Sequence, residues 1–129
     1  MPRTAEDVET YLYALNRPFN REGSTFIVSS GAEGPAIAIR VNDPILVVRV
    51  DIGNVPEDQA KQNAVFRRLL TFNATDLVQA AYALEGEEIV LTAGMPLENL
   101  DENELAAVLS DIDLALARHI AELRDLAST

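Results

Sequence analysis

The chain has 129 residues, 48% of them hydrophobic, so it is long enough for one domain with its own core and too apolar for a disordered tail. It has no cysteine, which excludes disulfides and thiolate metal sites. Its 10 basic and 21 acidic residues give a net charge of -11, and such a surface repels phosphate backbones and anionic membranes. We therefore expect a cytoplasmic protein that binds no nucleic acid and no membrane, without a signal peptide or membrane span.

The first predicted element is a short helix. Residues 4–7 have the spacing of a capping box, with aspartate in place of the usual glutamate, and apolar residues then recur at helical spacing as far as Leu15. The helix should end near Asn16, because Pro18 disfavours helical backbone at the residue before it. A polar turn is expected over residues 20–24.

Three predicted strands follow, over residues 25–30, 36–42 and 45–52. In each, apolar residues alternate with a period of two, which is typical of a sheet with one buried face. The third strand would place Leu46 and Val48 on one face, with Ile45 and Val47 opposite. The links over residues 31–35 and 42–44 are short, and short links force antiparallel pairing.

A helix over residues 57–72 and a hairpin are predicted next. The helix carries two stripes that together form an apolar face wider than contact with one sheet requires. One stripe consists of Val65, Leu69 and Phe72, and the second of Phe66, Leu69, Leu70 and Asn73. The hairpin consists of strands over residues 77–84 and 88–93, joined by a tight turn at residues 85–87.

The last predicted helix, over residues 101–126, has the clearest pattern. It begins with an N-cap aspartate and a glutamate three residues later. Its apolar residues repeat in a 3-4 spacing that includes His119, which allows either a coiled coil between chains or a helix lying on the sheet. We favour the helix on the sheet, because Val108 and Ala115 widen the stripe beyond a strict seam.

The predicted order is α-β-β-β-α-β-β-α, an α+β domain over residues 1–129 with an antiparallel sheet covered by helices. Three segments carry a family resemblance: LLTFN at residues 69–73, YALEGEEIVL at residues 82–91, and MPLENLD at residues 95–101. With the element order, they resemble the type III secretion chaperone-like fold. That group includes class I secretion chaperones of the Tir-chaperone type and the bacterial YbjN-like proteins.

The resemblance implies a homodimer without enzymatic activity that binds an extended segment of a partner protein, either in apolar patches or at a sheet edge. For the dimer contact we predict the middle helix, through Phe66, Leu69, Leu70 and Phe72. For the partner patch we predict Ile45, Val47, Leu77 and Val90. The net negative charge would attract a basic partner, although it is equally explained by solubility.

The residues predict no catalytic set, cofactor site or metal site. The single histidine, His119, falls on an apolar helical face, where a structural role is more common than catalysis. Acidic clusters at residues 85–88 and 101–104 lack the pattern of a calcium-binding loop and are better explained as a hairpin turn and a helix N-terminus. Two alternatives remain: a YbjN-like regulatory protein that acts through an unknown partner, and an enzyme with a carboxylate-based site.

Overall fold

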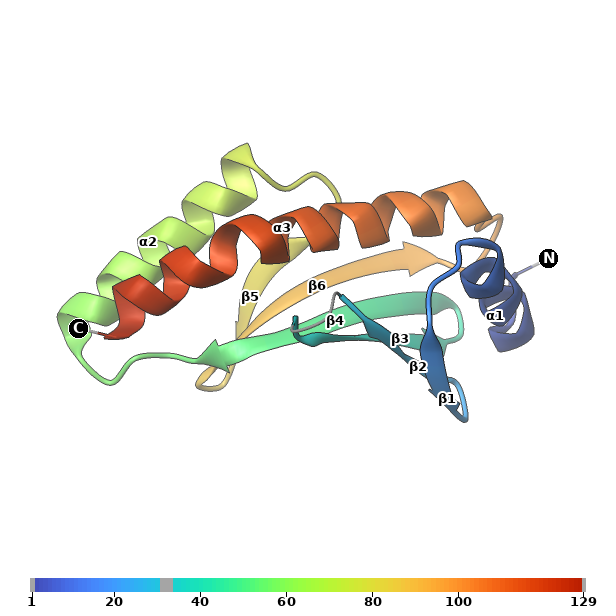
Figure 1. Ribbon diagram of the computed structural model, residues 1–129, viewed down its shortest axis with the longest axis horizontal. Helices are drawn as coiled ribbons and strands as arrows, with labels where there is room; N and C mark the ends of the chain where they lie inside the picture. Colours follow the sequence, from blue (N-terminus) through green and yellow to red (C-terminus); the bar gives the residue numbers. More distant parts are fainter. Residues whose placement is uncertain (1, 31–33, 129) are drawn as a thin grey trace.

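The computed structural model describes residues 2–30 and 34–128, in which three helices and six strands are found (Figure 1). Their order is α1 (Ala5–Ala14), β1 (Phe19–Glu22), β2 (Thr25–Ser29), β3 (Ala36–Asn42), β4 (Ile45–Asn54), α2 (Gln59–Thr75), β5 (Ala81–Glu85), β6 (Glu88–Pro96) and α3 (Glu102–Ser128). The predicted α+β class is confirmed, with one strand more than expected. The predicted link over residues 31–35 lies partly outside the described residues.

The strands form one antiparallel sheet in the order β1-β2-β3-β4-β6-β5. After β4 the chain leaves the sheet through α2 and returns as β5 at the far edge, and β6 then fills the space between β4 and β5. In Figure 1, α2 and α3 run along one face of the sheet, and α1 lies near the start of α3. β1 and β5 are therefore the edge strands.

The predicted alternation in β4 is confirmed. Leu46, Val48 and Val50 are fully buried on the face that the helices cover, which we call the inner face. Ile45 and Arg49 lie on the opposite, outer face. A β-bulge between Asp51 and Gly53 ends this regular pattern near the end of the strand.

The helix ends match their sequence signals. Thr4 and Asp7 form a reciprocal capping box at α1, and Asp101 and Glu104 exchange the corresponding hydrogen bonds at the start of α3. In α3 the side chains at the predicted 3-4 spacing, from Leu105 to Leu123, are buried within this single chain. α3 thus lies on the sheet, as favoured over a coiled coil between chains.

Two local predictions were wrong. Residues 19–22 form the edge strand β1, where the sequence predicted a polar turn from residue 20. The strand was missed because only Phe19 of these four residues is apolar, so no alternation is visible. The strand expected to begin at Leu77 begins at Ala81. Before that point, backbone N–H groups bind the side chain of Asp111 instead of a neighbouring strand.

Candidate functional site

An apolar groove lies between α2 and the edge strand β5. Its volume is about 400 Å³, and it is lined by Phe66, Leu69, Leu70, Asn73, Tyr82, Ala83 and Leu84. Two of these side chains are unusually exposed for leucine, Leu70 at 69% and Leu84 at 50%. Because exposed apolar side chains that gather around a groove mark interaction sites, we take this groove as the main candidate site.

The groove forms because one set of apolar residues on α2 packs into the core and another set lies beside β5. Val65, Leu69 and Phe72 are buried in the core of the chain. Phe66 and Leu70 are four residues apart, so they share a helical face that lines the groove beside β5, where Phe66 still packs partly against the core and Leu70 is exposed. This division accounts for the second apolar stripe that the sequence showed.

The structure places the four residues predicted for a dimer contact at two depths. Phe66, Leu69 and Leu70 line the groove, although Leu69 is itself almost completely buried. Phe72 lies behind the groove and stacks on the ring of His119, with ring centroids 3.6 Å apart. Of the four, Leu70 is the side chain most available to a second molecule.

At the groove, the side chain of Asn73 binds the outward backbone groups of one residue of β5, Tyr82. Its side-chain oxygen accepts a hydrogen bond from the backbone N–H of Tyr82 at 2.7 Å, and its side-chain nitrogen donates to the carbonyl of Tyr82 at 3.1 Å. The amide thus takes the place that a neighbouring strand would occupy. Sequence analysis placed Asn73 in the apolar stripe, and a polar residue in that stripe was the available signal for this role.

Asp111 on α3 satisfies the chain just before β5. Its Oδ2 atom accepts hydrogen bonds from the backbone N–H groups of Val78, Gln79 and Ala80, at 3.3, 2.9 and 3.0 Å. Three consecutive N–H groups form a cradle for an anion, here occupied by the protein's own carboxylate. Asp111 and Asn73 thus bind the outward backbone groups before and within the first part of β5. Those of Leu84, further along the strand, bind no described residue.

A buried polar network lies beneath the groove. His119 is 2% exposed, with Nδ1 2.8 Å from the hydroxyl of Tyr82 and Nε2 2.8 Å from Oδ2 of Asp76. The hydrogen bond from His119 is the main reason that the pKa of Asp76 is lowered. Burial raises the pKa of Tyr82, which makes its hydroxyl a poor nucleophile. The arrangement supports the structural role expected for His119.

The opposite edge of the sheet, β1, is arranged differently. β1 pairs with β2 through the two-residue turn at residues 23–24. In a hairpin of this kind Glu22 exchanges its backbone hydrogen bonds with Thr25, and Asn20 exchanges its own with Ile27. The outward backbone groups then belong to Phe19 and Arg21, and no described residue binds them. Beside this edge lies a surface cleft of about 360 Å³ that includes Tyr13 and Phe19. Sequence analysis missed this edge together with the strand itself.

The residues predicted as a partner patch do not come together. Ile45 and Val47 lie on the outer face of β4, whereas Leu77 packs against the core from the helix side. Val90 is on the outer face but only 4% exposed, and the ion pair between Arg49 and Glu85 crosses its strand from β4 to β5. Ile45 and Val47 are thus the part of the predicted patch that forms a shared surface, and a partner site there stays a prediction.

The six-stranded antiparallel sheet with three helices is an α+β domain of the secretion chaperone type. The sequence matches the CesT_Tir_1 family model over residues 1–129. The chain therefore belongs to this family of type III secretion chaperones. Membership in a chaperone family supports a non-enzymatic, protein-binding role.

Solved structures share the fold. A chain of the heterodimeric ExoU–SpcU complex from the type III secretion system of Pseudomonas aeruginosa is similar, with a TM-score of 0.69, 20% identity, and coverage of 94% of this chain and 98% of that chain. YbjN from E. coli has a TM-score of 0.68, 12% identity and 93% coverage of each chain. A chain of the HopA1–SchA chaperone–effector complex has a TM-score of 0.62, 12% identity, and coverage of 93% and 91%.

No curated protein sequence matches this chain significantly. Within residues 2–30 and 34–128, no helix has the length and apolar character needed to cross a membrane. The same residues contain no group of three or more histidine, aspartate or glutamate side chains placed to hold a metal ion.

Proposed function

We propose that this chain is a cytoplasmic, homodimeric chaperone that holds an extended segment of a partner protein. The groove between α2 and β5 would join the two copies, and the β1 edge with the adjoining outer face would receive the partner. The observation that carries the proposal is the contrast between the two edge strands. At β5 the outward backbone groups of Tyr82 bind Asn73 beside an exposed apolar groove, and only those of Leu84 bind no described residue. At β1 the outward groups of both Phe19 and Arg21 bind no described residue.

The groove suits contact through side chains. Because Asn73 occupies the outward backbone groups of Tyr82, a second molecule cannot pair with β5 there without displacing that side chain. What the groove offers instead is the apolar surface of Phe66, Leu70 and Leu84. A twofold axis placed beside α2 would bury this surface in both copies at once, which is the usual geometry of a homodimer.

The β1 edge suits contact through the backbone. An extended segment can add to an exposed strand edge by main-chain hydrogen bonds, while its side chains enter nearby pockets. The cleft at Tyr13 and Phe19 is such a pocket. On the outer face, the register aligns Ile27 of β2 with Ala38 of β3, and Ala38 with Arg49 of β4, whereas Val47 is aligned with Arg40. The apolar surface beside β1 therefore consists of Ile27 and Ala38 and is bordered by these two arginines.

The proposal is tested first by the solution mass of the protein, measured by light-scattering chromatography over a range of concentrations. We expect a mass near twice 14.1 kDa for the wild type. Leu70→Glu should give a folded monomer, because a charge in a buried apolar contact is strongly unfavourable.

Val78→Glu is the matched control. Val78 is 86% exposed, even more than Leu70, and does not line the groove. This variant should remain dimeric. A wild-type monomer at every concentration, or equal dissociation of both variants, would rule out the groove as the dimer contact.

A further inference from the structure

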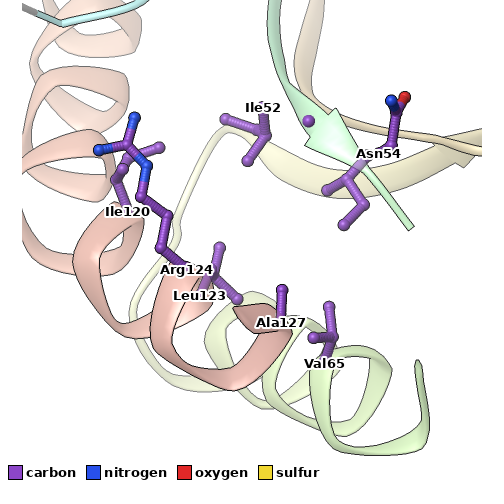
Figure 2. Close-up of a pocket in the computed structure, with 9 residues that line it drawn as sticks. Ile52, Asn54, Val65, Ile120, Leu123, Arg124 and Ala127 are labelled. Carbon is purple, nitrogen blue, oxygen red and sulfur yellow. The ribbon is translucent and has the colours of Figure 1, made fainter. Parts of the chain in front are cut away.

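A third, smaller pocket lies at the C-terminal end of α3, and no function has been assigned to it. Figure 2 shows Ile52, Val65, Leu123 and Ala127 around a common space, with Arg124 and Ile120 at its rim. The volume is about 100 Å³, and the walls are mainly apolar. A cavity of ~150 Å³ is known to hold a benzene molecule, so this pocket has room for one branched aliphatic side chain.

The pocket is produced by the bulge at the end of β4. The register of β4 against β6 shifts between Asp51 and Gly53, and Gly53 has a φ of 156°, a conformation that strongly favours glycine. The bulge bends the strand away from regular pairing and leaves Ile52 facing the ends of α2 and α3. Bulges of this kind are frequent beside binding sites.

Arg124 gives the pocket its chemical character. Its side chain is exposed, and the guanidinium group makes no hydrogen bond or ion pair with any of residues 2–30 and 34–128. Arg17, Arg21 and Arg68 are each paired with a carboxylate, and the exposed Arg40 and Arg67, which form no ion pair with a described residue, do not line the pocket. A guanidinium group at the rim of an apolar pocket is complementary to a carboxylate attached to an apolar group.

We infer that this pocket binds the C-terminal residue of another polypeptide, with an apolar side chain inside the pocket and its free carboxylate on Arg124. A C-terminal residue is the one place in a polypeptide where an aliphatic side chain and a carboxylate share the same Cα atom. The net charge of -11 would favour basic residues upstream of that end. The site is separate from the α2–β5 groove and from the β1 edge, so it does not depend on either proposed contact.

The test uses the full chain and a fluorescent peptide, Lys-Gly-Lys-Gly-Leu, whose binding is followed by fluorescence anisotropy. We expect the peptide with a free carboxylate to bind about tenfold more tightly than the same peptide with a C-terminal amide, because the amide removes the charge-assisted hydrogen bond. A peptide that ends in serine should bind as weakly as the amide. Equal binding of all three peptides, or no binding at all, would overturn the inference.

Three variants locate the site. Arg124→Gln should reduce binding of the free-acid peptide to the level of the amide, and Ala127→Leu should abolish binding of both by filling the pocket. Arg67→Gln is the control, because Arg67 is an exposed and unpaired arginine on α2 that does not line the pocket. An equal loss in Arg67→Gln would show that binding is only nonspecific charge attraction. Stronger binding of octanoate than of the peptide would also overturn the inference, because it would assign the pocket to fatty acids.

Discussion

Each edge strand of the sheet is the outer strand of a hairpin, yet the two edges differ in which backbone groups they leave without a hydrogen-bond partner among the described residues. β1 and β5 are both short strands, and each enters a hairpin through a two-residue turn, at residues 23–24 and 86–87. On β5 the outward backbone groups of Tyr82 bind Asn73 and those of Leu84 bind no described residue, and the N–H of Ala80, just before the strand, binds Asp111. On β1 the outward groups of Phe19 and Arg21 bind no described residue. The comparison teaches that side chains from neighbouring helices decide which edge can accept another strand.

The largest effect on stability is expected for Asn73→Ala. Two hydrogen bonds to a partly buried backbone are lost, which should lower the free energy of unfolding by about 2 kcal/mol. Urea denaturation measures this change. Asn63→Ala is the control, because Asn63 is exposed on the same helix and, among the described residues, its side chain hydrogen-bonds only with Gln59. If Asn73→Ala were as stable as the control, the β5 edge would not depend on this side chain.

Asp111→Ala should have a somewhat smaller effect. The three N–H groups that lose their acceptor belong to a largely exposed segment, so water can replace the carboxylate and the cost should be about 1 kcal/mol. Amide hydrogen exchange is the sharper measurement: exchange at residues 78–80 should accelerate while exchange in β2 and β3 stays unchanged. Uniform acceleration throughout the sheet would mean that Asp111 supports the whole fold and not this edge.

Acidification should weaken the β5 side through Asp76. The pKa of Asp76 is lowered in the folded protein, mainly by its hydrogen bond with His119, so its contribution to stability is present above the ordinary value of 3.8 and is lost as the pH falls through the lower, folded value. The difference in urea midpoint between the wild type and Asp76→Asn should therefore shrink below about pH 4. A difference that stays constant down to pH 2 would contradict this assignment.

The smallest effect on stability, with a large effect on binding, is expected for Arg21→Pro. Proline removes the outward N–H of β1 and is tolerated at an edge strand when that N–H faces solvent. Arg21→Ala is the matched control, because it loses the same ion pair with Glu6 but keeps the N–H. Once a partner protein is isolated, its affinity measured by calorimetry should fall for the proline variant alone. Equal affinities for both variants would place the partner away from this edge.

The sequence predicted the elements whose residues alternate or recur at regular spacing. The burial of Leu46 and Val48, the cap at Asp101 and the position of α3 on the sheet follow directly from such patterns. β1 was missed because its exposed edge requires no apolar alternation, and the start of β5 was misplaced because Asp111, more than 30 residues further along the chain, holds the segment before it. The groove could be foreseen in part, since Leu70 belongs to the second stripe of α2, whereas Leu84 joins it only through tertiary packing.

The position of α3 also bears on how the chain folds during synthesis. The strands β1 to β4 form a meander of local pairings and can associate as soon as they leave the ribosome, because contacts close in sequence form fastest. Their inner face, with Phe26, Ile39 and Val48, needs a cover from α3, which is translated after all six strands. A nascent chain therefore carries an uncovered apolar sheet until α3 emerges, and a premature stop near residue 100 should yield an aggregating product instead of a smaller folded domain.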